Sequence, residues 1–109
     1  MPKRSDELLL EDMLEAAQSV FDFVGSMNYD QFIADKKTVD AVVRNFEIIG
    51  EASKLISENI KINNPLIEWR ELTDFRNVLI HEYFGIDYEI LWNAITTMLP
   101  HNFEMLKLI

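Results

Sequence analysis

The segment from Val39 to Ile60 constrains the fold most, because its pattern predicts a helix that is apolar over most of its circumference. Its charged side chains recur every three or four residues, so at about 100° per residue they fall on one narrow stripe. The stripe contains Asp40, Arg44, Glu47, Glu51, Lys54 and Glu58. A helix with so little polar surface must be buried on more than one side, which predicts a central helix, a dimer contact, or both. Thr38 is its predicted N-cap, and Gly50 and Ala52 allow a close helix approach.

Three further helices are predicted from the same kind of spacing. The first spans residues 5–24, and the third spans residues 67–84 and ends at Gly85, where a left-handed cap is expected. The fourth follows Asp87 as its N-cap, and Pro100 should kink or split it. The fold class is therefore all-α: an antiparallel four-helix bundle in one domain over residues 1–109.

Composition narrows the chemistry. The chain has 109 residues, no Cys, and two His without a His-x-x-x-His pair, so we expect neither a metal site nor a cofactor. No apolar run reaches membrane-spanning length and the N-terminus is not a secretory signal, so the expected location is the cytoplasm. The formal net charge of −9 disfavours general binding to nucleic acid, although it suits a basic protein partner. The sequence also contains no signal specific for DNA binding.

Arg76 is the first anomaly of the third predicted helix. On a helical wheel it falls inside an apolar arc, between Trp69 and Tyr83, where an unpaired guanidinium is costly. Three interpretations remain open: an ion pair, for example with Glu51, a cleft at a subunit boundary, or a side chain that extends past apolar neighbours to water.

His81 and Asn77 form the second candidate pair. In a helix ending at Gly85, His81 would lie in the last turn, where the helix dipole favours its protonated form. Such a histidine serves as general acid or base, and Asn77, four residues earlier, would orient its ring. The alternative is that His81 is a cation placed at a helix C-terminus for dipole reasons alone.

The string Arg76-x-x-x-x-His81-Glu82-Tyr83 resembles the Arg-x4-His-x-Tyr signature of HepT-like proteins in the HEPN superfamily. The flanking stretches 69–72, 84–87 and 44–52 and the step at residues 99–100 are also similar to that family, so the resemblance covers nearly the whole chain. It implies a helical bundle that dimerises and brings two such motifs toward a shared cleft.

The resemblance further implies a metal-independent endoribonuclease that acts as a toxin. Arg76 and His81 would be catalytic and Asn77 supporting. Such proteins pair with a minimal nucleotidyltransferase antitoxin that transfers AMP to the signature tyrosine, here Tyr83. Arg44 and Arg70 would add local positive charge for RNA phosphate, while Glu51 or either arginine could instead form ion pairs.

Helical geometry conflicts with one requirement of this interpretation, that Arg76 and His81 act at the same site. Five residues apart on an ideal helix, Arg76 and His81 point about 140° away from each other. They converge either through a loosened last turn or across two subunits. The alternative function is a non-catalytic helical dimer that binds a nucleotide or serves as partner subunit of a minimal nucleotidyltransferase.

Overall fold

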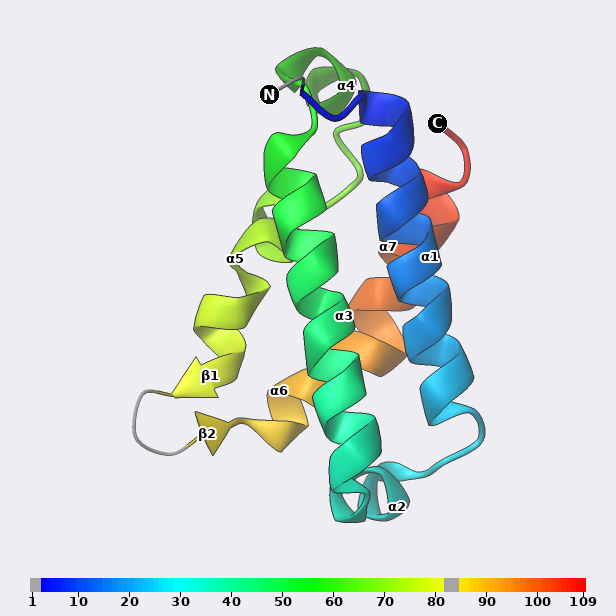
Figure 1. The fold of residues 1–109 in the computed structure, drawn as a ribbon, viewed down its shortest axis with the longest axis vertical. Coiled ribbons are helices and arrows are strands. Elements are labelled where there is room, and N and C mark those ends of the chain that lie inside the picture. The colour runs from blue at the N-terminus through cyan, green and yellow to red at the C-terminus, as the bar shows by residue number, and fades with distance from the viewer. Residues whose placement is uncertain (1–2, 82–84) are drawn as a thin grey trace.

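Antiparallel helical segments build the fold (Figure 1). The computed structural model describes residues 3–81 and 85–109, and the side chains of Ile80 and His81 lie outside its described part. Its long segments are α1 (Asp6–Val24), α3 (Lys36–Leu55), α5 (Trp69–Leu79) and a last one that joins α6 (Tyr88–Asn93), the π-helical η1 (Ala94–Met98) and α7 (Leu99–Leu106). Each runs opposite to the one before it, which confirms the all-α four-helix arrangement.

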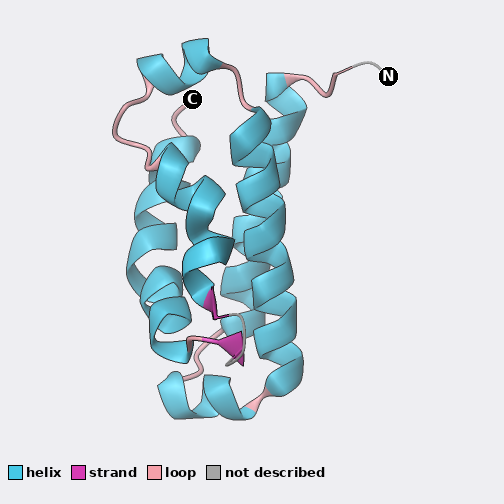
Figure 2. Ribbon diagram, turned by 90° about the vertical axis from the view of Figure 1, so that its left-hand side faces the viewer, coloured by secondary structure: helices cyan, strands magenta, loops and turns pink. Residues whose placement is uncertain are grey.

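Short elements connect these segments. The helices α2 (Tyr29–Ala34) and α4 (Glu58–Asn63) lie at opposite ends of the bundle. After α5, the two-residue strands β1 (Ile80–His81) and β2 (Gly85–Ile86) pair antiparallel (Figure 2), with Ile80 opposite Ile86 and His81 opposite Gly85. In the described part of the chain, no helix combines the length and the apolar character that a membrane span requires.

α3 is the central helix, as its sequence pattern predicts. It packs against α1 on one side and α5 on the other (Figure 1), and it buries Val42, Phe46 and Ile49 among its apolar residues. A Cβ built on Gly50 would lie only 3.1 Å from the carbonyl oxygen of Leu72. Gly50 therefore lets the backbones of α3 and α5 approach closely, which fixes α5 beside the charged stripe of α3.

Both predicted ends of this helix were wrong. Its N-cap is Asp35, not Thr38: the Asp35 carboxylate accepts hydrogen bonds from the amide and hydroxyl of Thr38 at 3.1 and 2.9 Å. The helix stops at Leu55 instead of Ile60, because Ile56 turns into extended backbone and remains buried. The amide of Ser57 then donates to the carboxylate of Asp6 in α1 at 3.0 Å, a tertiary contact that a continuous helix would not make.

The predicted N-cap of the fourth helix, Asp87, is confirmed, as is the break in the last segment. Ser5 accepts from the amide of Leu8 at the start of α1, and Asp87 accepts from that of Ile90 at the start of α6. Pro100 is the second residue of α7, directly after the wider π-helical turn η1. Proline has no amide hydrogen to donate, so regular α-helical hydrogen bonding cannot continue through this position.

The predicted end of the third helix was wrong. α5 stops at Leu79, and the carbonyl oxygen of Leu79 accepts a hydrogen bond from the amide of Asp87 at 2.9 Å. That bond replaces the one a continuing helix would use. Gly85 does have a left-handed conformation, with φ of 75°, but it lies in β2 opposite His81 and does not cap a helix.

The start of α5 is anchored by a fully buried asparagine. Asn102 of α7 accepts a hydrogen bond from the amide of Glu68 at 2.9 Å, and its own amide group donates to the Glu68 carboxylate at 3.0 Å and to the carbonyl of Met98 at 2.8 Å. On the α3 side, the hydroxyl of Ser53 donates to the carbonyl of Trp69 at 3.1 Å. These bonds explain why α5 begins at Trp69 rather than at Ile67.

Candidate active site

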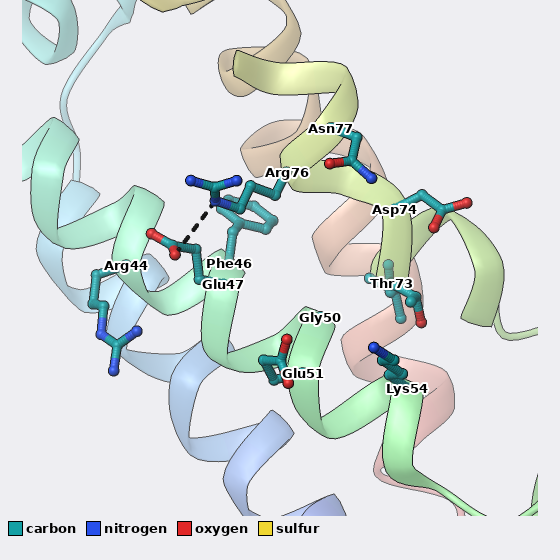
Figure 3. Close-up of a pocket in the computed structure, with 11 residues that line it drawn as sticks. Arg44, Phe46, Glu47, Gly50, Glu51, Lys54, Thr73, Asp74, Arg76 and Asn77 are labelled. Atoms are coloured by element: carbon teal, nitrogen blue, oxygen red, sulfur yellow. Dashed lines mark ion pairs between the residues drawn. The ribbon is translucent and has the colours of Figure 1, made fainter. Parts of the chain in front are cut away.

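A groove between α3 and α5 gathers four of the predicted site residues (Figure 3). It has a volume of about 390 Å³, and Arg44, Glu51, Arg76 and Asn77 lie along it. The remaining lining residues are Phe46, Glu47, Gly50, Lys54, Leu72, Thr73 and Asp74. The charged stripe of α3 thus forms one wall of the groove and the polar side of α5 forms the other.

Two phenylalanines set the register of these walls. The rings of Phe46 on α3 and Phe75 on α5 pack with their centroids 4.7 Å apart. The next residue of each helix, Glu47 and Arg76, then faces the groove. The Nε atom of Arg76 lies 3.5 Å from a carboxylate oxygen of Glu47 (Figure 3).

The structure decides among the interpretations left open for Arg76. Its side chain is 60% exposed, so it extends to water past Trp69, Leu72 and Phe75, which are buried on the same helix, and it also forms an ion pair. Its ion-pair partner is Glu47 rather than Glu51. An exposed pair at this distance contributes at most about 1 kcal/mol, so the guanidinium remains available to a ligand.

The charges lining the groove balance. Three cationic side chains (Arg44, Lys54 and Arg76) face three carboxylates (Glu47, Glu51 and Asp74). The side chains that line the groove therefore carry no net charge, whereas the whole chain carries −9, and the groove is not a basic patch. Over the described ranges, no three His, Asp or Glu side chains gather into a group that could hold a metal ion.

Arg70 does not join this group. It is almost fully exposed, pairs with Asp74 at 3.9 Å, and lines a different hollow together with Phe75, Val78 and Met98. Of the two alternatives for Arg70, the structure therefore shows the ion pair, and Arg70 does not add positive charge to the groove that Arg44 and Arg76 line. A turn and a half of helix separates Arg70 from Arg76, so the two arginines leave α5 in different directions.

The remaining predicted residues lie at or beyond the end of α5. The backbone of His81 belongs to β1, so the helix-dipole argument and the helical spacing from Asn77 no longer apply. The angle of about 140° between the side chains of Arg76 and His81 assumed one continuous helix, so it no longer applies either. The imidazole of His81 lies outside the described side chains, and Glu82 and Tyr83 lie outside the described residues.

Sequence reasoning missed four polar residues of the groove: Glu47, Lys54, Thr73 and Asp74. Glu47 and Lys54 did belong to the predicted charged stripe of α3, but nothing in the stripe indicated which acid would face Arg76. That choice depends on how α3 and α5 align, which the Phe46–Phe75 contact decides. Thr73 gave no signal in the sequence, because its contact depends on how the two helices pack: its hydroxyl donates to the hydroxyl of Ser53 on α3 at 3.1 Å.

Comparison with known proteins identifies the class. The family described as Ribonuclease HepT-like matches residues 13–109. The chain is 43% identical over 108 aligned residues to "Probable ribonuclease HepT" of Thermococcus cleftensis, covering 96% of this chain and 98% of that protein. It is 42% identical over 100 residues to "Putative RNase MJ1380" and 38% identical over 107 residues to "Putative RNase MJ0127", both of Methanocaldococcus jannaschii.

The match to "Putative RNase MJ1380" covers 92% of this chain and 92% of the relative. The match to "Putative RNase MJ0127" covers 98% of this chain and 88% of the relative. The chain belongs to the HepT-like ribonuclease family of the HEPN superfamily. No solved structure matches it significantly. The resemblance drawn from the Arg-x4-His-x-Tyr string is thereby confirmed.

Proposed function

We propose that this chain is a metal-independent endoribonuclease, with Arg76 and His81 as its catalytic residues. The observation that carries the proposal is the position of Arg76, whose exposed guanidinium faces an open groove and is held only loosely by Glu47. Family membership supports RNA as the substrate class. The cytoplasm is the compartment that this substrate and the absence of Cys favour.

The proposed reaction needs no external nucleophile. The 2′-hydroxyl of a ribose attacks the adjacent phosphorus, the bond from phosphorus to the 5′-oxygen of the next nucleotide breaks, and a 2′,3′-cyclic phosphate and a 5′-hydroxyl result. One proton leaves the attacking hydroxyl and one reaches the departing oxygen. His81 is the proposed proton carrier, because a histidine changes protonation state near neutral pH.

Arg76 stabilises the charge that develops on the phosphate. Its planar fork matches two phosphate oxygens, and pairing through Nε with Glu47 leaves the two terminal nitrogens to bind them. Asn77, the next residue on the same groove, supports either the phosphate or the imidazole. Arg44 and Lys54 on the facing wall offer further contacts for the RNA backbone.

The location of His81 after the helix, in β1, changes how the two residues would converge. Because β1 pairs with β2, the chain beyond Leu79 leaves the axis of α5 at once. The convergence then occurs within one protomer, or across a homodimer whose two motifs border one cleft. We favour the homodimer, in keeping with the predicted role of a shared cleft.

The reaction type is tested with matched oligonucleotides of one sequence. In excess EDTA, the wild-type chain is expected to cleave the all-RNA strand and to leave the DNA and 2′-O-methyl strands intact. The products should carry 2′,3′-cyclic phosphate and 5′-hydroxyl ends, identified by mass spectrometry. Loss of cleavage in EDTA, or products with 5′-phosphate ends, would contradict the mechanism.

Regulation by AMP transfer is the finer part of the proposal. The chain would act as a toxin whose partner is a minimal nucleotidyltransferase antitoxin encoded in the adjacent open reading frame. The hydroxyl oxygen of Tyr83 attacks the α-phosphorus of ATP, and pyrophosphate leaves. An AMP anion two residues from His81 would repel RNA phosphate and block the site.

The transfer is tested by incubating both proteins with ATP and Mg²⁺. We expect one AMP adduct by intact mass, located on Tyr83 by peptide mapping, together with loss of RNA cleavage. Tyr83→Phe should abolish the adduct, whereas Tyr88→Phe, at an exposed tyrosine five residues on, should retain it. An adduct on another residue, or none, would remove this part of the proposal.

The balanced charge of the groove is the observation that favours the alternative function, a non-catalytic dimer serving a nucleotidyltransferase or holding a nucleotide. A neutral groove attracts RNA less than a basic one does, and the acidic surface suits a basic protein. A pure protein that leaves RNA uncut yet co-purifies with the nucleotidyltransferase would establish this alternative.

A further inference from the structure

A second groove lies where α2 meets the last helical segment, away from the candidate active site. It consists of two adjoining hollows of about 290 and 250 Å³, which share Trp92 and Thr96. Tyr29 and Glu89 line the first hollow, and Phe21 and Pro100 line the second. Neither hollow shares a residue with the groove between α3 and α5, so a ligand here need not compete with RNA.

Aromatic rings form the wall of this groove. The indole of Trp92 is only half-buried and packs edge-on against Tyr29, with ring centroids 6.0 Å apart. Behind it, the fully buried ring of Phe32 lies 5.4 Å from the indole and fixes its orientation. The result is an aromatic surface that a planar or cationic group could stack on.

The charged features of the groove favour a positive ligand rich in hydrogen-bond donors. The carboxylate of Glu89 lies on its rim, and the negative end of α1, whose last turn carries Asp22 and no basic residue, closes its far side at Gly25. Pro100 has no amide hydrogen, so it adds no backbone donor to the second hollow.

The state of Tyr29 agrees with this negative character. Desolvation raises the pKa of its hydroxyl above the ordinary value, and the charges of Glu89 and Asp30 raise it further. No Lys or Arg is among the described residues that line either hollow. Lys36, at the start of α3 nearby, is already paired with Asp40 at 2.7 Å. The groove therefore has acceptors and aromatic faces but no cation of its own.

We propose that this groove binds an arginine side chain presented by a basic segment of a protein partner. A guanidinium is planar, so it stacks on the indole of Trp92 while its donors reach the carboxylate of Glu89. A lysine ammonium is compact and strongly hydrated, and it fits such a surface less well. The net charge of −9 adds long-range attraction for a basic partner.

The indole N–H of Trp92 can report directly on binding at this site. Its two tryptophans are Trp92, in the groove, and Trp69, which is buried at the start of α5 with its indole nitrogen donating to the carbonyl of Asn64. Their indole N–H signals are read separately in a ¹H–¹⁵N NMR spectrum of the whole chain. Titration with N-acetyl-arginine amide is expected to shift the Trp92 signal in a saturable way and to leave the Trp69 signal unmoved.

Matched ligands and variants make the test specific. N-acetyl-citrulline amide has nearly the shape of the arginine compound without its charge and should not shift Trp92, and the lysine compound should bind more weakly. Glu89→Gln should weaken arginine binding about three- to tenfold at low salt. Glu58→Gln, at an exposed acid on α4, changes net charge equally and should have no effect. Equal weakening by both variants, or equal shifts with citrulline, would overturn the proposal, as would an unmoved Trp92 signal.

Discussion

Replacing Arg76 with alanine is expected to lower RNA cleavage by about 10²- to 10³-fold without unfolding the chain. The substitution removes the donors that would meet the phosphate as charge develops on it. It costs little stability, because the side chain is 60% exposed and its pair with Glu47 is long and solvent-accessible. The measurement is the initial rate of oligonucleotide cleavage in EDTA, together with the melting temperature.

The control for this experiment lies on the same helix. Arg70→Ala changes the net charge identically, but Arg70 faces a different hollow, so its cleavage rate should stay within about twofold of wild type. Arg76→Lys keeps the charge but loses the planar fork, so we expect an intermediate rate. Equal rates for Arg76→Ala and Arg70→Ala would show that only general electrostatics was lost, and would reject the assigned role.

The histidine variant then locates the site within or between protomers. His81→Ala should be as inactive as Arg76→Ala, and the double variant little worse, because the two residues act on one step. If each site takes Arg76 from one protomer and His81 from the other, mixing the two inactive single variants after subunit exchange restores part of the activity. If each protomer holds a complete site, the mixture stays inactive.

The second large effect is expected at Asn102, far from the groove. Asn102→Leu should lower the free energy of unfolding by about 2–3 kcal/mol, equivalent to a fall of about 10 °C in melting temperature. Leucine matches the volume but leaves the amide of Glu68, its carboxylate and the carbonyl of Met98 without the partner that now serves all three. Thermal and urea unfolding followed by circular dichroism give both quantities.

Asn93→Leu is the matched control, because Asn93 is exposed on the same helical segment and should change stability by less than about 0.5 kcal/mol. Asn102→Leu should also reduce cleavage at temperatures well below unfolding, since Asn102 anchors the start of the helix that carries Arg76. An Asn102 variant as stable as wild type would mean that water replaces the lost hydrogen bonds.

Local chemistry explains which parts of the fold were predictable. Asp87 was identified as a cap because its side chain bonds an amide three residues ahead, a contact that neighbouring sequence alone specifies, and Ser5 caps α1 in the same way. The break around Pro100 follows from its missing amide hydrogen. The central position of α3 follows from its narrow charged stripe, because a helix with few polar side chains must be covered on both flanks.

The errors share a different cause. The ends of α3 and α5 depend on hydrogen bonds between residues that the helical repeat does not connect: Ser57 to Asp6, and Asp87 to Leu79. Helical periodicity continues past both points, so it favours helices that are too long. The partner of Arg76 was missed for a related reason, since the helical wheel of one helix contains no information on its alignment with another.

The sequence by itself determined the helical class, the Asp87 cap, the central helix and the family signature, because periodicity, capping chemistry and the residue string are all properties of neighbouring residues. Only the tertiary structure decided that Arg76 is exposed, that Glu47 is its partner, that Arg70 lies elsewhere and that His81 follows the helix in a strand. The physical reason is that these features depend on the contact between α3 and α5, set by Gly50 and by the packing of Phe46 on Phe75.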